Sequence, residues 1–272
     1  MIHRLSLLTL PFFSASAFAQ EKLTSDKSFT VFSYNVENLF DTINDPEKDD
    51  EEFLPEGKNK WTSDRYLKKL EQLSKVISTT NEKNLPTIIG LYEIENKKVV
   101  KDLAATKKLS KGKYGVVHYE SPDKRSIDVA LMYRKNKFSV IYSKALNVRL
   151  PEEPPYPTRD ILYVKGITGK NDTLHFFVNH WPSRRSGADE SEKNRIAAAL
   201  VLKHSVDSIF SKNASAKIII MGDFNDYPTN KSITETLGAD SVFAADKSND
   251  LYNLCYEFEK KNEGTYNYKN DW

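Results

Sequence analysis

The segment Lys217-Ile-Ile-Ile-Met-Gly-Asp-Phe-Asn-Asp226 decides the fold class of this chain. Its apolar run at residues 218–221 is typical of a strand that is buried on both faces of its sheet. Asp223 and Asn225 follow this run, although an ordinary surface strand ends in Gly, Pro, Ser or Lys turn residues. The segment therefore predicts a buried strand that carries polar functional groups at its carboxyl end.

Four further polar clusters lie beside apolar segments with strand character. They are Asn35-Val-Glu37 after residues 29–34, Glu93 after residues 88–92, Asn179-His180 after residues 174–178, and Arg125-Ser-Ile-Asp128 before residues 129–133. A strand that starts at Asp128 brings this residue to the same edge if it runs antiparallel to its neighbour. A single Asp after a strand is usually a turn or helix N-cap residue, but five clusters in one chain favour a shared rim of functional groups.

Hairpin-linked strands alternate with amphipathic helices along the chain. Helices are expected at residues 62–80, 96–109, 189–210, 232–237 and 250–260, and further strands at 114–119, 127–133, 138–142, 160–167 and 173–179. Short turns join the three strands between residues 114 and 142, which predicts an antiparallel meander. Because strict βαβ repetition is missing, we predict an α/β fold in which two mixed sheets form a four-layer α/β/β/α sandwich.

Residues 1–19 have the features of a secretory signal peptide. Arg4 provides a short positive region, an apolar stretch follows, and Ala17-Phe-Ala19 matches the small-x-small rule for cleavage. A membrane anchor is the alternative, but Pro11 interrupts an apolar stretch that is shorter than the ~20 residues needed to span a bilayer. We predict cleavage after Ala19, a secreted or periplasmic domain at residues 20–272, and no integral membrane segment after cleavage.

The charge balance and the single cysteine exclude some classes of function. The formal net charge of +2 does not favour broad electrostatic capture of nucleic acid, so phosphate binding requires a local site. Cys255 is the only cysteine and cannot form an intramolecular disulfide. Its apolar neighbours recur at helical spacing, which predicts a buried packing role rather than a nucleophile.

The residue types at the expected rim suit a divalent cation and a phosphate ester. Carboxylate and amide oxygens are ligands for Mg²⁺, Mn²⁺ or Ca²⁺, and a carboxylate can orient or deprotonate a water molecule. The chain has no His-Glu-x-x-His, no Gly-x-Ser-x-Gly and no P-loop, which disfavours zinc proteases, α/β-hydrolases and P-loop nucleotide binding. Hydrolysis of a phosphate ester by metal-activated water is the class that fits.

Read with their neighbours, the five clusters resemble the ordered motifs of the endonuclease/exonuclease/phosphatase superfamily. The matching segments are Ser33-Tyr-Asn35-Val-Glu37-Asn-Leu-Phe, Leu91-Tyr-Glu93-Ile-Glu-Asn, Ser126-Ile-Asp128-Val-Ala-Leu-Met-Tyr, Asn179-His180-Trp-Pro-Ser-Arg and Met221-Gly-Asp223-Phe-Asn225-Asp. The resemblance implies that Glu93 is the principal metal ligand, with Asn35 close to the metal and Glu37 assisting. Mg²⁺ is the cofactor it implies, with Mn²⁺ or Ca²⁺ as alternatives.

The same resemblance implies roles on the phosphate side of the site. His180 would contact the scissile phosphate, Asp223 would orient or deprotonate the attacking water, and Asn225 would bind a phosphate oxygen. Asp128 matches a polar catalytic residue of the family. Two arginines, Arg125 and Arg184, are further candidate phosphate contacts. The alternative for both is an ordinary surface role.

The chain departs from the family pattern at its end. The pattern continues with a further strand and an Asp-His pair, whereas this sequence stops at Trp272 and its five His residues lie at or before position 204. We therefore expect a fragment whose sheet lacks the last strand or strands and whose activity is low.

The predicted function is that of an exported, Mg²⁺-dependent phosphodiesterase, nuclease-like and monomeric, with a phosphate ester such as DNA or RNA as substrate. Two alternatives stay open. One is a phosphomonoesterase or a sphingomyelinase-like lipase, and the other is a non-catalytic phosphate-binding remnant.

Overall fold

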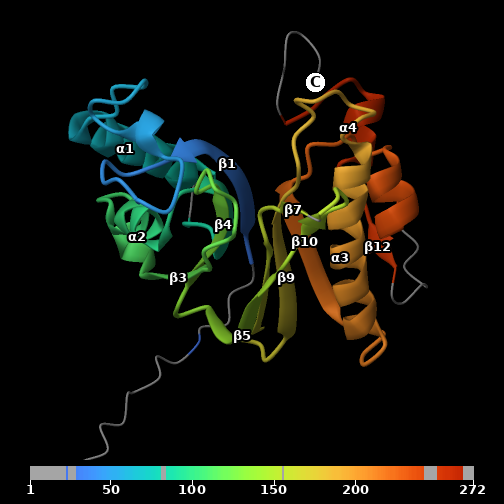
Figure 1. Ribbon diagram of the computed structural model, residues 1–272. Helices are drawn as coiled ribbons and strands as arrows, with labels where there is room; N and C mark the ends of the chain where they lie inside the picture. The colour runs from blue at the N-terminus through green and yellow to red at the C-terminus, as the bar shows by residue number, and fades with distance from the viewer. Residues whose placement is uncertain (1–22, 24–28, 81–83, 155, 242–249, 266–272) are drawn as a thin grey trace, which may run out of the picture.

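Two four-stranded sheets pack face to face in the computed structural model, which describes residues 23, 29–80, 84–154, 156–241 and 250–265 (Figure 1). The first sheet has the order β1 (Val31–Leu39), β2 (Ile88–Ile94), β4 (Asp128–Arg134), β3 (Tyr114–His118). The second has the order β10 (Lys217–Asp223), β9 (Thr173–His180), β8 (Ile161–Thr168), β5 (Phe138–Leu146). In both sheets one edge pair is parallel, β1 with β2 and β10 with β9, and the other pairs are antiparallel.

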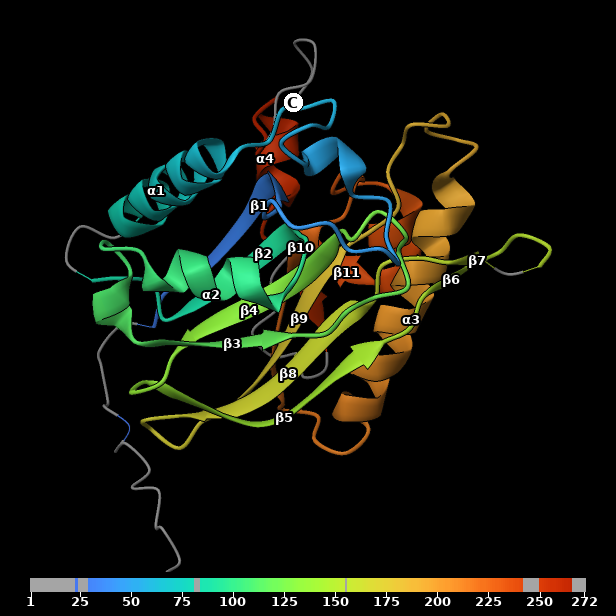
Figure 2. The same cartoon turned by 60° about the vertical axis from the view of Figure 1, so that its left-hand side comes forward.

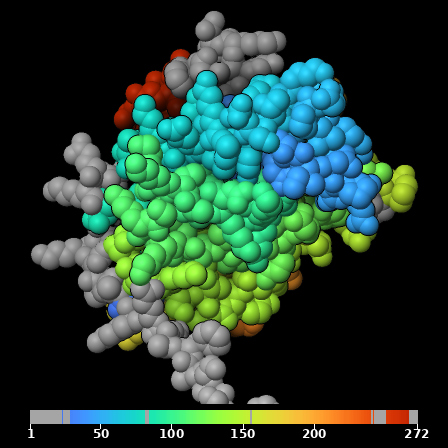
Figure 3. Space-filling view, turned by 90° about the vertical axis from the view of Figure 1, so that its left-hand side faces the viewer, coloured from blue at the N-terminus to red at the C-terminus, as the bar shows by residue number. Residues whose placement is uncertain are grey.

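Helices cover the outer faces of both sheets. Helices α1 (Ser63–Thr79) and α2 (Lys97–Ala105) lie on the first sheet, and α3 (Glu192–Phe210) lies on the second (Figures 1 and 2). On the side of the molecule that carries the first sheet, the blue-to-green segments around α1 and α2 make up most of the surface (Figure 3). The predicted α/β/β/α sandwich of mixed sheets is confirmed.

The remaining elements are short. They are η1 (Glu51–Phe53), η2 (Ser110–Gly112), β6 (Arg149–Leu150), β7 (Tyr156–Pro157), the π-helical turn η3 (Ser232–Leu237), β11 (Ala239–Asp240), β12 (Leu251–Tyr252) and α4 (Tyr256–Lys260). Among the described residues, none of the helices is long and apolar enough to span a bilayer.

Three layers of apolar side chains hold the sandwich together. One lies between the first sheet and its two helices, where Leu70, Leu73 and Ile77 of α1 belong to the same apolar cluster as Ile89 and Leu91 of β2. The central layer joins the inner faces of the two sheets, and the third lies between the second sheet and α3. Because β2 and β9 are covered on both faces, they are continuous apolar runs rather than alternating ones.

The strands approach each other closely at glycine positions next to the polar ends. A Cβ atom on Gly222 of β10 would lie 2.5 Å from the backbone oxygen of Asn179 in the paired strand β9. A Cβ atom on Gly90 of β2 would lie 2.7 Å from Sδ of Met221, which belongs to the opposite sheet. The first neighbour is backbone, whereas the second is the flexible end of a side chain. Of these two glycines, Gly222 is therefore the one that tolerates a side chain less well.

The structure corrects some of the sequence-based expectations and leaves others untested. The helix expected at residues 250–260 is wrong in its first half, because Leu251–Tyr252 form β12 and α4 begins at Tyr256. The predicted meander is wrong in its last strand, because β5 crosses to the second sheet and pairs with β8; Phe138 at its start is fully buried in the central layer. Cys255 is exposed rather than buried, since it precedes the short, solvent-facing helix α4, where Leu254 is 77% exposed. The signal peptide lies outside the described residues, and the further strand stays a prediction.

Replacing Gly222 with Ala is expected to lower the free energy of unfolding by about 1–3 kcal/mol, because β9 must move away from the new methyl group. The matched control is Gly90→Ala, for which Met221 can shift its thioether, so a smaller loss is expected. Urea denaturation measures both. If the Gly90 variant lost as much free energy of unfolding as the Gly222 variant, or more, the packing of β10 against β9 would be looser than described.

Candidate active site

The carboxyl ends of β1, β2, β9 and β10 meet at one end of the sandwich. Nδ2 of Asn35, on β1, lies 3.0 Å from Oε1 of Glu93 on β2. The same nitrogen lies 3.0 Å from Oδ2 of Asp223, on β10 of the opposite sheet. Two carboxylates that are distant in sequence thus share one donor, the amide of Asn35, and the predicted rim exists at their position.

A bulge in β1 determines which end of the Asn35 amide faces the carboxylates. The backbone N–H of Glu37 donates to Oδ1 of Asn35 at 2.9 Å, so the amide nitrogen is left to face Glu93 and Asp223. The register of β1 against β2 shifts between Asn35 and Leu39, and Glu37 has φ 54°. In this structure Asn35 therefore positions the acidic groups by donating hydrogen bonds to them.

Left-handed backbone conformations gather at the strand ends. Glu93 has φ 62° at a bulge in β2, Asn225 has φ 50° just after β10, and Ser126 has φ 53° just before β4. Non-glycine residues adopt this region at a cost of about 1–3 kcal/mol, and such residues cluster at functional sites. The bent ends turn side chains out of the regular alternation of each strand and toward the rim.

His180 ends β9 beside this group of carboxylates. Its Nε2 lies 4.0 Å from Oε1 of Glu93, and its side chain is 7% exposed. Burial, followed by the positive charges of Arg159 and Arg125, lowers the pKa of His180 well below its usual range. The imidazole is therefore neutral at neutral pH, and within the described residues its Nδ1 has no hydrogen-bond partner.

A buried arginine that the sequence pattern did not reveal supports His180. Arg159 donates from Nε to the carbonyl of His180 at 2.9 Å and from Nη2 to the carbonyl of Trp181 at 2.7 Å. Its Nη1 donates to Asp123 at 3.1 Å. The sequence signal that could have identified it is the pair of charged residues, Arg159 and Asp160, before the buried strand β8.

Arg125 shares the carboxylate of Asp123 with Arg159. It donates to Asp123 from Nε at 3.1 Å and from Nη2 at 2.8 Å, and its side chain is 46% exposed. Although burial alone would raise the pKa of Asp123, the hydrogen bonds and charges of the two arginines lower it on balance. The hydrogen bond to Asp123 raises the pKa of Arg125, with a smaller contribution from the negative charge of Glu93. Arg125 thus extends a positive field toward the candidate site.

The loop after β10 is tied down by its own polar groups. The backbone N–H of Asn225 donates to Oδ1 of Asp223 at 3.0 Å, and Nδ2 of Asn225 donates to the carbonyl of Trp181 at 2.9 Å. Further along, the side chain of Asp226 is fully buried, and its Oδ1 lies 2.9 Å from Nε of Arg195 on α3. With one oxygen bound by Asn225 and the other by Asn35, Asp223 has a defined orientation.

Three other predicted residues make different contacts. Glu37 is exposed and lines an open cleft of about 320 Å³ together with Trp61 and Lys69. The guanidinium of Arg184 stacks 4.6 Å from the ring centroid of Tyr227. Asp128 starts β4 opposite Ile94, as the antiparallel arrangement predicts, but its carboxylate faces two other residues, Ser121 and His118.

A model of the Endonuclease/Exonuclease/phosphatase family matches residues 30–272. The chain belongs to this family. The resemblance carried by the five motifs is therefore confirmed, and the family consists of phosphoesterases and nucleases. A search of curated protein sequences found no significant match.

Solved structures of the family share the fold at low identity. A mannosyl-6-phosphatase from Bacteroides thetaiotaomicron is 18% identical, with a TM-score of 0.52 over 76% of this chain and 69% of that one. Humanized D. rerio TDP2 is 15% identical, with a TM-score of 0.50 over 78% and 68%. The human Nocturnin catalytic domain is 19% identical, with a TM-score of 0.47 over 59% and 62%. The chain thus spans less than two thirds of the Nocturnin domain, and 48% of TDP2 from C. elegans.

The oxygen donors fit the metal dependence of the family. Glu93 and Asp223 are carboxylates held beside one shared donor, which is the ligand chemistry of a hard divalent cation. The side chain of Glu93 is 20% exposed, so a cation can reach it from solvent. The two carboxylates would otherwise repel each other, and the amide of Asn35 holds them near each other by donating to both.

Replacing Asn35 with Asp is expected to lower the free energy of unfolding in EDTA by about 1–3 kcal/mol, because a third carboxylate replaces the donor between Glu93 and Asp223. Asn213→Asp is the control, since its Oδ1 accepts from the backbone N–H of Ser215 and an Asp can keep that bond. Chemical denaturation compares the two. The described geometry is contradicted if the Asn35 variant is no less stable than the control.

Proposed function

We propose that this chain is an exported, Mg²⁺-dependent phosphodiesterase whose reaction takes place beside Glu93, Asn35 and Asp223. One observation carries the proposal: a single amide nitrogen lies 3.0 Å from a carboxylate of each sheet. A neutral His180 stands 4.0 Å from the first of these carboxylates. Hard oxygen donors beside an uncharged imidazole suit the hydrolysis of a phosphate ester.

Glu93 and Asp223 would hold the cation, and Asn35 would keep the two carboxylates together. When bound, Mg²⁺ supplies Lewis-acid stabilisation of the charge that develops on a phosphate oxygen. Glu37 is assigned no ligand role in this proposal, because its side chain lines the neighbouring cleft.

The side chains of the rim divide the remaining tasks. Asp223 is oriented before substrate binds, so its carboxylate can orient or deprotonate the attacking water. The neutral imidazole of His180 can donate to a phosphate oxygen from one ring nitrogen. Asn225 acts on Asp223 through its backbone N–H, and Arg125 adds positive charge that attracts an anionic substrate.

The substrate we propose is a short or single phosphodiester rather than a long duplex. The formal net charge of +2 provides little of the nonspecific attraction on which binding to long DNA depends. We also propose that residues 1–19 direct export of a monomer, and an exported protein that begins at Gln20 would support this.

Glu93→Gln and Asp223→Asn are expected to lower the hydrolysis of bis-p-nitrophenyl phosphate by roughly 10²–10⁴-fold, and EDTA should abolish it in the parent. The control is Glu71→Gln, an exposed change on the outer side of α1. p-Nitrophenyl phosphate, sphingomyelin, inositol phosphates and plasmid DNA are assayed in parallel. Faster hydrolysis of a monoester or a lipid than of the diester would replace the proposed specificity by one of the alternatives.

Calorimetry with Mg²⁺ tests the site independently of turnover, which matters because the family's Asp-His pair is not among these 272 residues. The parent and the Glu71 variant should bind Mg²⁺, whereas the Glu93 variant should bind it roughly tenfold or more weakly. Equal binding by the parent and the Glu93 variant would contradict the proposed metal site and favour a non-catalytic remnant.

A further inference from the structure

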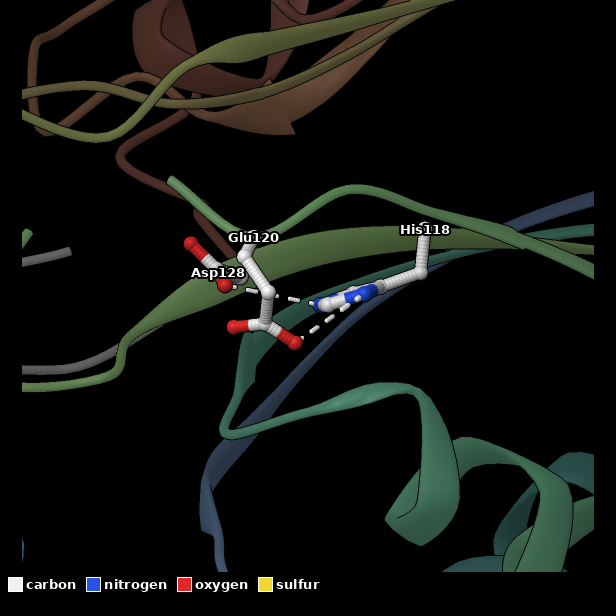
Figure 4. A group of neighbouring side chains, drawn as sticks. All are labelled: His118, Glu120 and Asp128. Carbon is white, nitrogen blue, oxygen red and sulfur yellow. Dashed lines mark ion pairs between the residues drawn. The ribbon is translucent and has the colours of Figure 1, made fainter. Parts of the chain in front are cut away.

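A second group of metal-ligating side chains lies where β3 and β4 meet. His118 ends β3, Glu120 follows two residues later, and Asp128 begins β4. Nε2 of His118 lies 3.5 Å from Oδ2 of Asp128, and Nδ1 lies 3.7 Å from Oε1 of Glu120. Figure 4 shows both carboxylates directed toward the imidazole. One potential ligand atom from each residue lies within 4.8 Å of the other two.

Two atoms of this group are buried without a hydrogen bond. The side chains of His118 and Asp128 are 2% and 1% exposed, and within the described residues neither Nε2 nor Oδ2 has a hydrogen-bond partner. The other oxygen of Asp128 accepts from the backbone N–H of Ser121 at 3.1 Å. Each buried polar atom without a hydrogen bond costs about 1–3 kcal/mol of stability. We therefore expect a bound group to pair with these two atoms.

The charges around Glu120 also favour a bound cation. The carboxylates of Glu120 and Asp128 lie on either side of the same imidazole, 3.7 and 3.5 Å from its two nitrogens. Lys48, a nearby positive charge, donates its hydrogen bonds to the backbone carbonyls of Ser121 and Asp123 at 2.8 and 3.0 Å. The repulsion between the two carboxylates is therefore incompletely compensated by the protein.

We propose that His118, Glu120 and Asp128 form a second metal site that binds a borderline divalent cation, with Zn²⁺ as the preferred ion and Mn²⁺ as a competitor. One imidazole nitrogen with two carboxylates is a donor set that these ions accept. The group of Glu93 and Asp223 presents oxygens from its carboxylates and suits Mg²⁺ instead. The two sites thus differ in ligand chemistry.

The spacing of the buried pair matches such an ion. Two ligands that lie about 2.1 Å from Zn²⁺ at a tetrahedral angle are about 3.4 Å apart. His118 Nε2 and Asp128 Oδ2 are 3.5 Å apart. Glu120 is 54% exposed, so it can swing inward to complete three ligands and leave a position for water.

A metal ion bound by His118 and Asp128 would link the two ends of the loop at residues 119–127. This loop carries Asp123, which binds both Arg125 and the buried Arg159. Arg159 in turn holds the backbone carbonyl of His180. A cation at the base of the loop would therefore stabilise the support of the candidate active site without contacting the substrate.

The test is a Zn²⁺ titration of the whole chain by calorimetry with Mg²⁺ in excess. We expect one Zn²⁺ per chain, bound roughly tenfold or more weakly by Glu120→Gln and His118→Gln. The controls are Glu71→Gln, the exposed change on α1, and Glu93→Gln, which alters the other site; both should leave Zn²⁺ affinity unchanged.

Glu120→Gln keeps the test interpretable if the buried His118 variant does not fold, because Glu120 is exposed. Circular dichroism checks the fold of both. The proposal is overturned if the parent binds no Zn²⁺ or if Glu120→Gln binds it as tightly as the parent. Loss of Zn²⁺ binding in Glu93→Gln would also overturn it, because the ion would then occupy the other site.

Discussion

The hydrogen bonds from one amide nitrogen of Asn35 to carboxylates of opposite sheets are the constraint on which the site depends. Two carboxylates placed side by side repel each other, and neither sheet alone holds both. The bulge of β1 turns the amide so that its oxygen is used by the backbone of Glu37 and its nitrogen faces the acidic groups. Gly222, which packs closely against the backbone of β9, directly precedes Asp223 at the end of β10.

A second set of interactions makes the rim electrostatically asymmetric. Buried Arg159 holds the backbone at His180 and Trp181, and its charge helps to keep the imidazole neutral. Acidic oxygens therefore lie on one side of the site and positive charge on the other. The ion pair between Asp226 and Arg195 anchors the loop after β10 to α3, so the orientation of Asp223 is connected to the outer helix layer.

The fold class and the rim could be predicted from the sequence because both follow from local patterns. Continuous apolar runs identify the strands that are covered on both faces, and polar residues at their ends identify the rim. The sheet to which β5 belongs could not be predicted from the sequence. The short turn after β4 is compatible both with a hairpin and with a crossover to the other sheet, and the structure has the crossover. Arg159 was missed because its three partners, two backbone carbonyls and Asp123, lie elsewhere in the chain. Asp128 reaches the predicted end of the sandwich, but side-chain contacts with His118 are set by β3 pairing and not by its motif.

A double-mutant cycle between Asn35 and Asp223 tests the central claim most directly. Asn35→Ala, Asp223→Ala and the combined variant are unfolded with urea in the presence of EDTA, and the coupling energy is calculated from their free energies of unfolding. Because the two residues lie on different sheets and contact each other at 3.0 Å, a coupling of about 0.5–3 kcal/mol is predicted. Additive losses, within about 0.5 kcal/mol, would contradict a site in which the two sheets share one donor.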